Sequence, residues 1–582
     1  MWCPNAGKFV GNCDTHFLLC RWQELFGPYT PENYHPKLLS LPTLVSEALK
    51  VSEYFSDSPA RLGKNLACIQ EEIRERLASS EGKLCSPWHL SLVTKLSRPD
   101  CKHTETRDLA KVLIHDNFAQ NIEDETRLTL QRLLHSTGKF PKKRVDTHLR
   151  LLGTFALQKG YSSSVVENID NHFDKNPQEA LEHIFSTIPN GNEIYPCVIA
   201  IEHSSEMRPA IRAVCDDINA ETLPNMEGLP RGGQYLFLFS RISGLHVGDA
   251  LANFKAIIQT RLNLVALFYH KADYRLLEEG WLYDGVRISP INHAFHAIRK
   301  EQQSHKAKHE ATNSLSSLKD DDPHRFSLLS ALDLHAQALV AKDHRVRLVN
   351  LWSALECLSS VVGNNERISI IDRVQRLVLP ILTLRKVDKL VRYLAISIRS
   401  WLVENPSVGK GPLPFPRANN GSVPAERILT LLTKKNGSPE IAALLHVVGG
   451  HPLLVYRVYR AWELFNDGKI LHSNLTRSLQ ELRWHLSRIY RARNLIVHRG
   501  IEVDLLPQLA DNLENYVSWT LTRLLHGIRL HKHTNVQTAW HFWEHKSAYT
   551  LNALQNQQDI LTVGDIFPSQ SVKAPYYPAW ES

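Results

Sequence analysis

The stretch that decides the fold is LHSNLTRSLQELRWHLSRIYRARNLIVHRG, residues 471–500. Its apolar side chains recur in alternating steps of four and three, which is the spacing of one face of an α-helix. These positions are Leu475, Leu479, Leu482, Leu486 and Ile489. The next two positions of the series are Arg493 and Ile496. The pattern predicts a long amphipathic helix in which an arginine takes the place of a buried aliphatic residue.

Arg493 needs a partner if the helix buries it, because desolvating a guanidinium is costly unless the charge is paired or faces an anion. No Asp or Glu occurs between residues 482 and 501, so the same stretch of helix offers no carboxylate. The partner must come from elsewhere in the fold, or it is the phosphate of a ligand. Four further arginines surround Arg493 in the sequence: Arg483, Arg488, Arg491 and Arg499.

The end of this helix carries two more polar side chains, Asn494 and His498, followed by Gly500 as a suitable C-cap. Asn494 and His498 are four residues apart and share a face. Arg493 and His498 are five apart, about 140° around a regular helix. They can meet on one phosphate only if the helix distorts or a second copy supplies the missing group. A histidine in the last helical turn is favoured in its cationic form and suits general acid–base work.

The positive charge of the chain is concentrated around this helix. Between residues 325 and 530, 28 Lys and Arg stand against 16 Asp and Glu, whereas the rest of the chain has 40 against 44. The net charge of +8 over 582 residues is therefore the sum of +12 in residues 325–530 (28 minus 16) and −4 in the rest (40 minus 44). A basic excess confined to one segment indicates that this segment meets phosphate.

The hexapeptide RNLIVH at residues 493–498 resembles the R-x4-H signature of HEPN-domain ribonucleases. Upstream, Trp352 and Glu356 stand four apart in LWSALECL, similar to the W-x-x-x-E helix of the Apea-like branch of that superfamily. Tyr490, just before the hexapeptide, adds to the likeness. The resemblance covers roughly residues 325–532.

The resemblance implies a helical bundle that forms a homodimer through the motif helices, with one composite site that cleaves RNA without a metal or cofactor. A ribose 2′-hydroxyl would attack the adjacent phosphorus and leave a 2′,3′-cyclic phosphate. His498 would be the general acid or base, Arg493 would hold the phosphorane oxygens, and Asn494 would orient the phosphate or the imidazole. Glu356, supported by Trp352 and Tyr490, would pair with Arg493 or tune His498. The surrounding Arg483, Arg488, Arg491 and Arg499 would contact RNA.

The rest of the chain is read by its patterning. Helical spacing dominates except in the middle, where the apolar runs 194–201 and 234–239 indicate buried strands. We therefore expect a mostly helical α+β protein, in which Pro380 breaks or kinks a long helix and a loop occupies 405–424. Its expected parts are a helical N-terminal region at 1–160, a small α/β or α+β module at 161–297, a polar linker at 298–324, a HEPN-like helical bundle at 325–532 and a C-terminal tail at 533–582.

The surroundings predicted for the chain are those of the cytoplasm. It has no apolar run long enough to span a membrane and no signal-peptide pattern at its N-terminus. Its nine cysteines are scattered and include no C-x-x-C pair, which favours reduced thiols over a disulfide framework.

Together these features predict a bacterial endoribonuclease that acts as a regulated toxin or in defence against phage, the defence role resting on the resemblance alone. Residues 1–297 would be a sensor that answers a phage-derived or nucleotide trigger, with the brake in the α/β module and the linker. Two alternatives remain: a non-catalytic module that binds RNA or a partner protein, and a structural role through dimerisation. In the simplest structural interpretation, Arg493 is paired with Glu356 and His498 is merely exposed.

Overall fold

The computed structural model describes residues 12–26, 39–54, 59–135, 140–159, 173–188, 193–218, 234–244, 247–269, 272–283, 288–290, 321–341, 343–363, 368–409, 413–414, 423–434, 438–501, 503–530 and 535–556. The chain divides into two compact units. One, the helical unit, comprises Met1–Thr154, His172–Ala180 and Gln302–Ser582, and the other comprises Phe155–Asn171 and Leu181–Glu301. The helices predicted at the N-terminus and those of the predicted bundle thus belong together.

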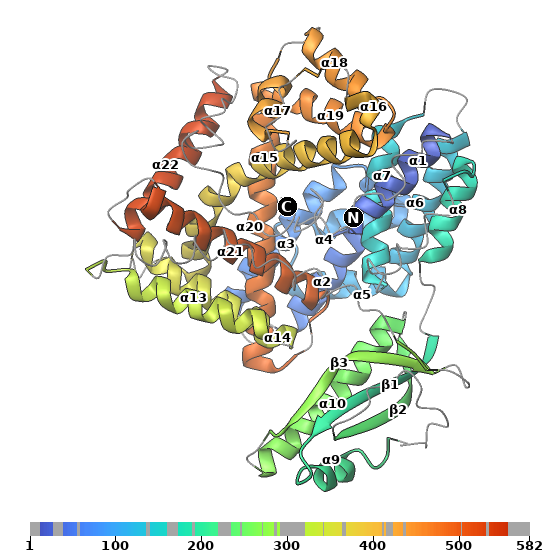
Figure 1. Ribbon diagram of the computed structural model, residues 1–582, viewed down its shortest axis with the longest axis vertical. Coiled ribbons are helices and arrows are strands. Elements are labelled where there is room, and N and C mark those ends of the chain that lie inside the picture. Colours follow the sequence, from blue (N-terminus) through green and yellow to red (C-terminus); the bar gives the residue numbers. More distant parts are fainter. Residues whose placement is uncertain are drawn as a thin grey trace. The chain divides into compact units, whose positions relative to one another are not determined.

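The described elements confirm a mostly helical α+β protein (Figure 1). The N-terminal helices are α1 (Cys13–Phe26), α2 (Leu41–Tyr54), α3 (Pro59–Leu77), η1 (Gly82–Leu84), α4 (Pro87–Leu96), α5 (His103–His115), α6 (Phe118–His135), α7 (Lys142–Gln158) and α8 (Pro177–Thr187). The C-terminal helices are α13 (Arg325–Val340), α14 (His344–Leu358), η3 (Ser359–Val362), α15 (Ile370–Glu404), α16 (Pro406–Gly409), α17 (Ala425–Leu432), α18 (Pro439–Val447), α19 (Pro452–Phe465), α20 (Gly468–Arg499), α21 (Leu506–Leu530) and α22 (Val536–Gln555).

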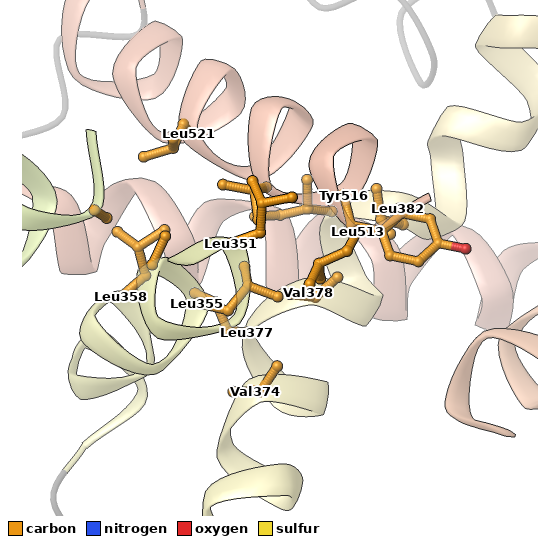
Figure 2. Close-up of a cluster of buried hydrophobic side chains, with 14 of the residues drawn as sticks. Leu351, Leu355, Leu358, Val374, Leu377, Val378, Leu382, Leu513, Tyr516 and Leu521 are labelled. Atoms are coloured by element: carbon orange, nitrogen blue, oxygen red, sulfur yellow. The ribbon is translucent and has the colours of Figure 1, made fainter. Parts of the chain in front are cut away.

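Two hydrophobic cores lie within the C-terminal helices. In the first, α13, α14, the first part of α15, the second part of α20, α21 and α22 pack together. Figure 2 shows its centre, where Leu351 and Leu355 of α14 meet Val378 of α15 and Leu513 of α21. The second core joins the rest of α15 and the start of α20 to α17, α18 and α19. The helices α15 and α20 therefore tie the two cores together.

Of the break or kink expected at Pro380, the break does not occur, since α15 runs through it from Ile370 to Glu404. A proline inside a helix removes one backbone hydrogen bond, and burial on both sides compensates here. Leu377 and Ile381 belong to the first core, and Val391 and Leu394 to the second. Most of the loop predicted at 405–424 lies outside the described residues.

The tail predicted from residue 533 is wrong as far as residue 555. There, α22 buries Trp540 and Trp543 in the first core and Leu554 in the second. Its first amide, that of Val536, donates to Asp322 Oδ2 at 2.8 Å, so an acid near the end of the predicted linker accepts from the first turn of this helix. The sequence signal that could have predicted α22 is the helical spacing of the aromatic residues Trp540 and Trp543. Residues 557–582, and the predicted linker up to 320, lie outside the described part.

Buried ion pairs join the N-terminal helices to α15 and α19. Glu24 of α1 accepts hydrogen bonds from Arg21 at 2.8 Å, from Tyr393 of α15 at 2.5 Å and from Arg457 of α19 at 3.2 Å. Arg21 also donates to Asp146 of α7 at 2.5 Å. Because each charge is buried with its counter-charge, separating these helices would expose unpaired ions. The helices α1 and α7 therefore pack with α15 and α19 as part of one unit.

His485 of α20 gives the helical unit a pH-dependent stability. Its Nδ1 lies 3.0 Å from the Tyr516 hydroxyl, and burial, with the nearby Arg488 charge, lowers the pKa of His485 to about 3. In the unfolded chain the imidazole titrates near about 6.5. The unfolded state therefore binds a proton that the folded state excludes, so stability is full above this value and falls by about 2 kcal/mol at pH 5. Urea unfolding at pH 7 and pH 5 measures the loss. His485→Gln should reduce the difference, and His446→Gln should not; an unreduced difference in the first variant contradicts this account.

The second unit contains a four-stranded sheet in the order β2-β1-β3-β4, formed by β1 (Glu193–His203), β2 (Tyr235–Gly244), β3 (Tyr274–Tyr283) and β4 (Ile288–Pro290). All described pairings are antiparallel, so the module is α+β, one of the two forms that the sequence left open. The helices α9 (Arg208–Val214) and α10 (Val247–Tyr269) pack on one face. A side chain at Gly280 of β3 would overlap Leu251 of α10, so glycine permits this close approach. Both predicted strands lie in β1 and β2.

Among the described residues, no helix combines the length and the apolar character that crossing a bilayer requires. The eight described cysteines are all free thiols.

Candidate functional site

The helix predicted from residues 471–500 is present as α20, and both ends are capped. At its start the Asp467 side chain accepts the amide of Lys469 at 2.8 Å. At its end Gly500 has φ +62°, a left-handed conformation that glycine adopts without strain, which confirms the predicted C-cap. Leu482, Leu486 and Ile489 of the predicted apolar stripe are buried in the first core.

Arg493 lies beside Glu356, as the sequence left open. Its Nη2 is 3.7 Å from Glu356 Oε2, and the two side chains are 20% and 24% exposed. Arg493 Nη1 also donates to Asn494 Oδ1 at 3.1 Å. Its Nε is buried and has no hydrogen-bond acceptor among the described residues. The guanidinium is therefore only loosely held.

Glu356 is positioned by the two aromatic residues singled out with it. The indole Nε1 of Trp352 donates to Glu356 Oε1 at 2.7 Å, and Trp352 is fully buried. The rings of Trp352 and Tyr490 are 5.3 Å apart. Residues of α14 and α20, more than 130 positions apart in the chain, thus form one cluster. Hereafter the RNH cluster means Arg493, Asn494 and Glu356 with Trp352 and Tyr490, together with His498.

His498 stands apart from the other members on the same helix. It is exposed in the last turn of α20, and Asn494 is one turn before it. Because α20 is helical through Arg499, the angle between the Arg493 and His498 positions stays at about 140°. Distortion of the helix does not bring the two side chains together, so a shared phosphate would require a second copy.

Arg488 and Arg491 are not available to RNA in this structure, which corrects the RNA contacts expected of them. Arg488 donates to Glu47 of α2 at 2.9 Å and to Glu72 of α3 at 2.6 Å. Arg491 donates to Glu47 at 2.5 Å. Both arginines are buried. Although burial favours the protonated acid, the two arginines lower the pKa of Glu47 to about 2, so this carboxylate is charged at neutral pH.

More polar contacts continue this junction between α2, α3 and α20. Glu71 Oε2 accepts from Trp484 Nε1 at 3.1 Å and from Gln480 Nε2 at 3.2 Å. Glu75 lies 3.4 Å from Arg477. The sequence did not identify these N-terminal acids as the partners of the arginines. The only signal was the lack of acidic residues near Arg493 on the same helix. That absence indicated a distant partner without identifying it.

Arg483 and Arg499, the other two expected RNA contacts, are exposed on α20. Nothing in their burial prevents them from meeting a phosphate. The RNH cluster itself can bind an anion through Arg493, and His498 can exchange protons with solvent. The group of described side chains best placed to hold a metal lies on α22 and includes no member of the cluster.

No family model, curated protein or solved structure matches this chain.

Proposed function

We propose that the chain is a metal-independent endoribonuclease of the HEPN type, with Arg493, Asn494 and His498 as its catalytic residues. The observation that carries the proposal is the state of Arg493. It is half-buried at the edge of the core, 3.7 Å from one carboxylate, and its Nε lacks an acceptor among the described residues. Arg488, by contrast, donates to two carboxylates through Nε and Nη2, and only its Nη1 lacks an acceptor among the described residues. An arginine with spare donors is suited to a phosphate, which accepts several at once.

The chemistry follows from the groups present. The ribose 2′-oxygen attacks the adjacent phosphorus and the bond to the 5′-oxygen breaks, which leaves a 2′,3′-cyclic phosphate and a 5′-hydroxyl. His498 takes the proton from the 2′-hydroxyl or gives one to the leaving oxygen, a contribution of about 10²–10⁴ in rate. Arg493 stabilises the charge on the phosphorane oxygens through its planar fork. DNA lacks the nucleophile and is not a substrate.

The site is completed by a second copy of the chain. A twofold axis beside the C-terminal part of α20 would bring His498 of one copy towards Arg493 of the other, which one straight helix cannot do. Exposed Arg483 and Arg499 would extend the basic surface along the RNA. We further propose that the activity is restrained and serves in defence against phage, because an unrestrained ribonuclease would harm its own cell. Part of this restraint on RNA cleavage is the packing of α2 and α3 against α20, where Glu47 and Glu72 bind Arg488 and Arg491.

The test is cleavage of single-stranded RNA by the full chain in the presence of EDTA. We expect products with 2′,3′-cyclic phosphate ends, and no cleavage of the same sequence made with 2′-O-methyl riboses. Cleavage of the methylated strand, or products with other ends, would contradict the proposed route. Comparable cleavage by His498→Ala would remove His498 from the mechanism.

A non-catalytic RNA-binding module is the second candidate, and one observation favours it. Glu356 is already oriented by Trp352 towards Arg493, as in a structural ion pair. In that case the chain binds RNA without cutting it. Arg483→Ala and Arg499→Ala would then weaken binding, whereas His498→Ala would have no effect on any measured property.

A further inference from the structure

Three potential metal ligands lie together on α22. They are His541, Glu544 and His545, in the sequence HFWEH. One ligand atom from each side chain lies within 4.8 Å of those from the other two. None of them takes part in the proposed RNA chemistry. No metal site was predicted from the sequence.

The spacing of these residues makes them neighbours because the segment is a helix. Positions i, i+3 and i+4 lie on one face, one turn apart. The rings of His541 and His545 are 6.2 Å apart and within 29° of parallel, so they stand side by side. Glu544 Oε2 is 3.1 Å from His541 Nδ1. A carboxylate thus already lies against one of the two imidazoles.

The helix that carries the ligands is firmly anchored. Its first turn has a capping box, in which Asn535 Oδ1 accepts the amide of Thr538 at 2.8 Å. On the adjacent face, Trp540 and Trp543 are 3% and 2% exposed in the first core. The indole of Trp543 also donates to the carbonyl of Arg523 in α21 at 3.3 Å. The backbone positions of the three ligands are therefore fixed before any metal arrives, which lowers the ordering cost of binding.

The side chains themselves retain the freedom to close around an ion. His541 and Glu544 are each 44% exposed, and His545 is exposed as well. Ligands at the usual bond lengths of about 2.0–2.2 Å in a tetrahedral site stand roughly 3.3 Å apart. The present separations, within 4.8 Å, must therefore shorten through rotation of the side chains when the ion binds.

The donor set selects the kind of ion. Two imidazole nitrogens and one carboxylate oxygen suit Zn²⁺ and its neighbours Cu²⁺, Ni²⁺ and Co²⁺, whereas Mg²⁺ and Ca²⁺ prefer oxygen ligands throughout. Three protein ligands leave the fourth position of a tetrahedral zinc site to water or to a donor from another molecule.

We propose that His541, Glu544 and His545 form a binding site for a divalent transition-metal ion, with Zn²⁺ as the expected occupant. This site is independent of the ribonuclease proposal. Its ion ties together two consecutive turns of α22 and keeps one coordination position open to a ligand from solution.

The experiment measures Zn²⁺ binding to the full chain, freed of any polyhistidine tag, by competition with a chromogenic chelator. The wild-type chain is expected to bind one equivalent that His541→Ala and His545→Ala each lose. Removal of an outer-shell partner alone costs about 10–100-fold in affinity, so loss of a ligand should cost at least as much. Glu544→Gln should also weaken binding, because the neutral amide is a poorer ligand.

A matched control separates this site from the other histidines of the chain. His446→Ala with His472→Ala removes an exposed histidine from α18 and a partly buried one from α20 and should leave the tight equivalent unchanged. Far-ultraviolet circular dichroism without metal should be the same for all variants, since the altered side chains lie outside the core. Unchanged Zn²⁺ affinity in the folded His541→Ala variant overturns the proposal, and so does loss of binding in the control.

Discussion

Replacement of His498 by alanine is expected to slow RNA cleavage by about 10²–10⁴-fold, the usual contribution of a general acid or base. His498 is exposed in the last turn of α20, so its removal should leave the melting temperature of the chain unchanged. His472→Ala, on the same helix but near its other end, is the matched control and should cleave at the wild-type rate. A similar loss of cleavage rate in both variants would contradict a specific catalytic role for His498.

Arg493→Ala and Arg493→Lys separate charge from geometry at the same site. Alanine removes the phosphate contact, whereas lysine keeps the charge without the planar fork. If Arg493 stabilises the phosphorane, both variants lose rate and lysine recovers only part of it. If Arg493 serves only to pair with Glu356, the lysine variant cleaves at the wild-type rate.

Mixing two inactive variants tests whether the site is shared between copies. In a dimer of one Arg493→Ala copy and one His498→Ala copy, a site that takes Arg493 from one copy and His498 from the other has one intact arrangement. Cleavage should therefore reappear when the two proteins are mixed and allowed to exchange subunits. If each copy uses its own Arg493 and His498, the mixture remains inactive.

Periodicity predicted the local structure well, because it depends on neighbours in the sequence. The stripe from Leu475 to Ile489, the cap at Gly500 and the strands β1 and β2 follow from spacing and residue type alone. The predictions that were wrong depend on tertiary contacts between residues far apart in the sequence, which periodicity does not describe. Pro380 stays within α15 because tertiary packing on both sides outweighs the missing hydrogen bond.

The candidate site shows the same division. Trp352, Glu356 and Tyr490 could be singled out by resemblance, and they do lie with Arg493. The partners of Arg488 and Arg491 could not be identified, because any of the 60 acids in the chain satisfies a rule about charge alone. The ligands on α22 were missed for another reason. His541 and His545 converge only on a helix, and their segment was predicted as a tail.

Replacement of Glu47 by glutamine is expected to lower the free energy of unfolding by about 3–5 kcal/mol, because it removes one partner of a buried ion pair and leaves the other uncompensated. Glu47 accepts from both Arg488 and Arg491, and Arg491 has no other carboxylate acceptor among the described residues. The carboxylate is ionised at neutral pH, since its pKa is lowered to about 2. Its contribution is therefore complete at neutral pH and is lost only as the pH falls from the ordinary carboxyl range towards that value.

Glu75→Gln is the matched control, because Glu75 pairs with Arg477 of the same helix, α20, at 3.4 Å across the same junction. Those two side chains are 44% and 51% exposed, so water replaces the lost partner and the cost should stay below about 1 kcal/mol. Urea unfolding at pH 7 compares the two variants. Equal losses would mean that Arg488 and Arg491 are solvated rather than buried against α2. If Glu47→Gln also raises RNA cleavage while Glu75→Gln does not, the ion pairs that stabilise this junction also restrain the site, because the freed arginines then face the phosphate instead of Glu47.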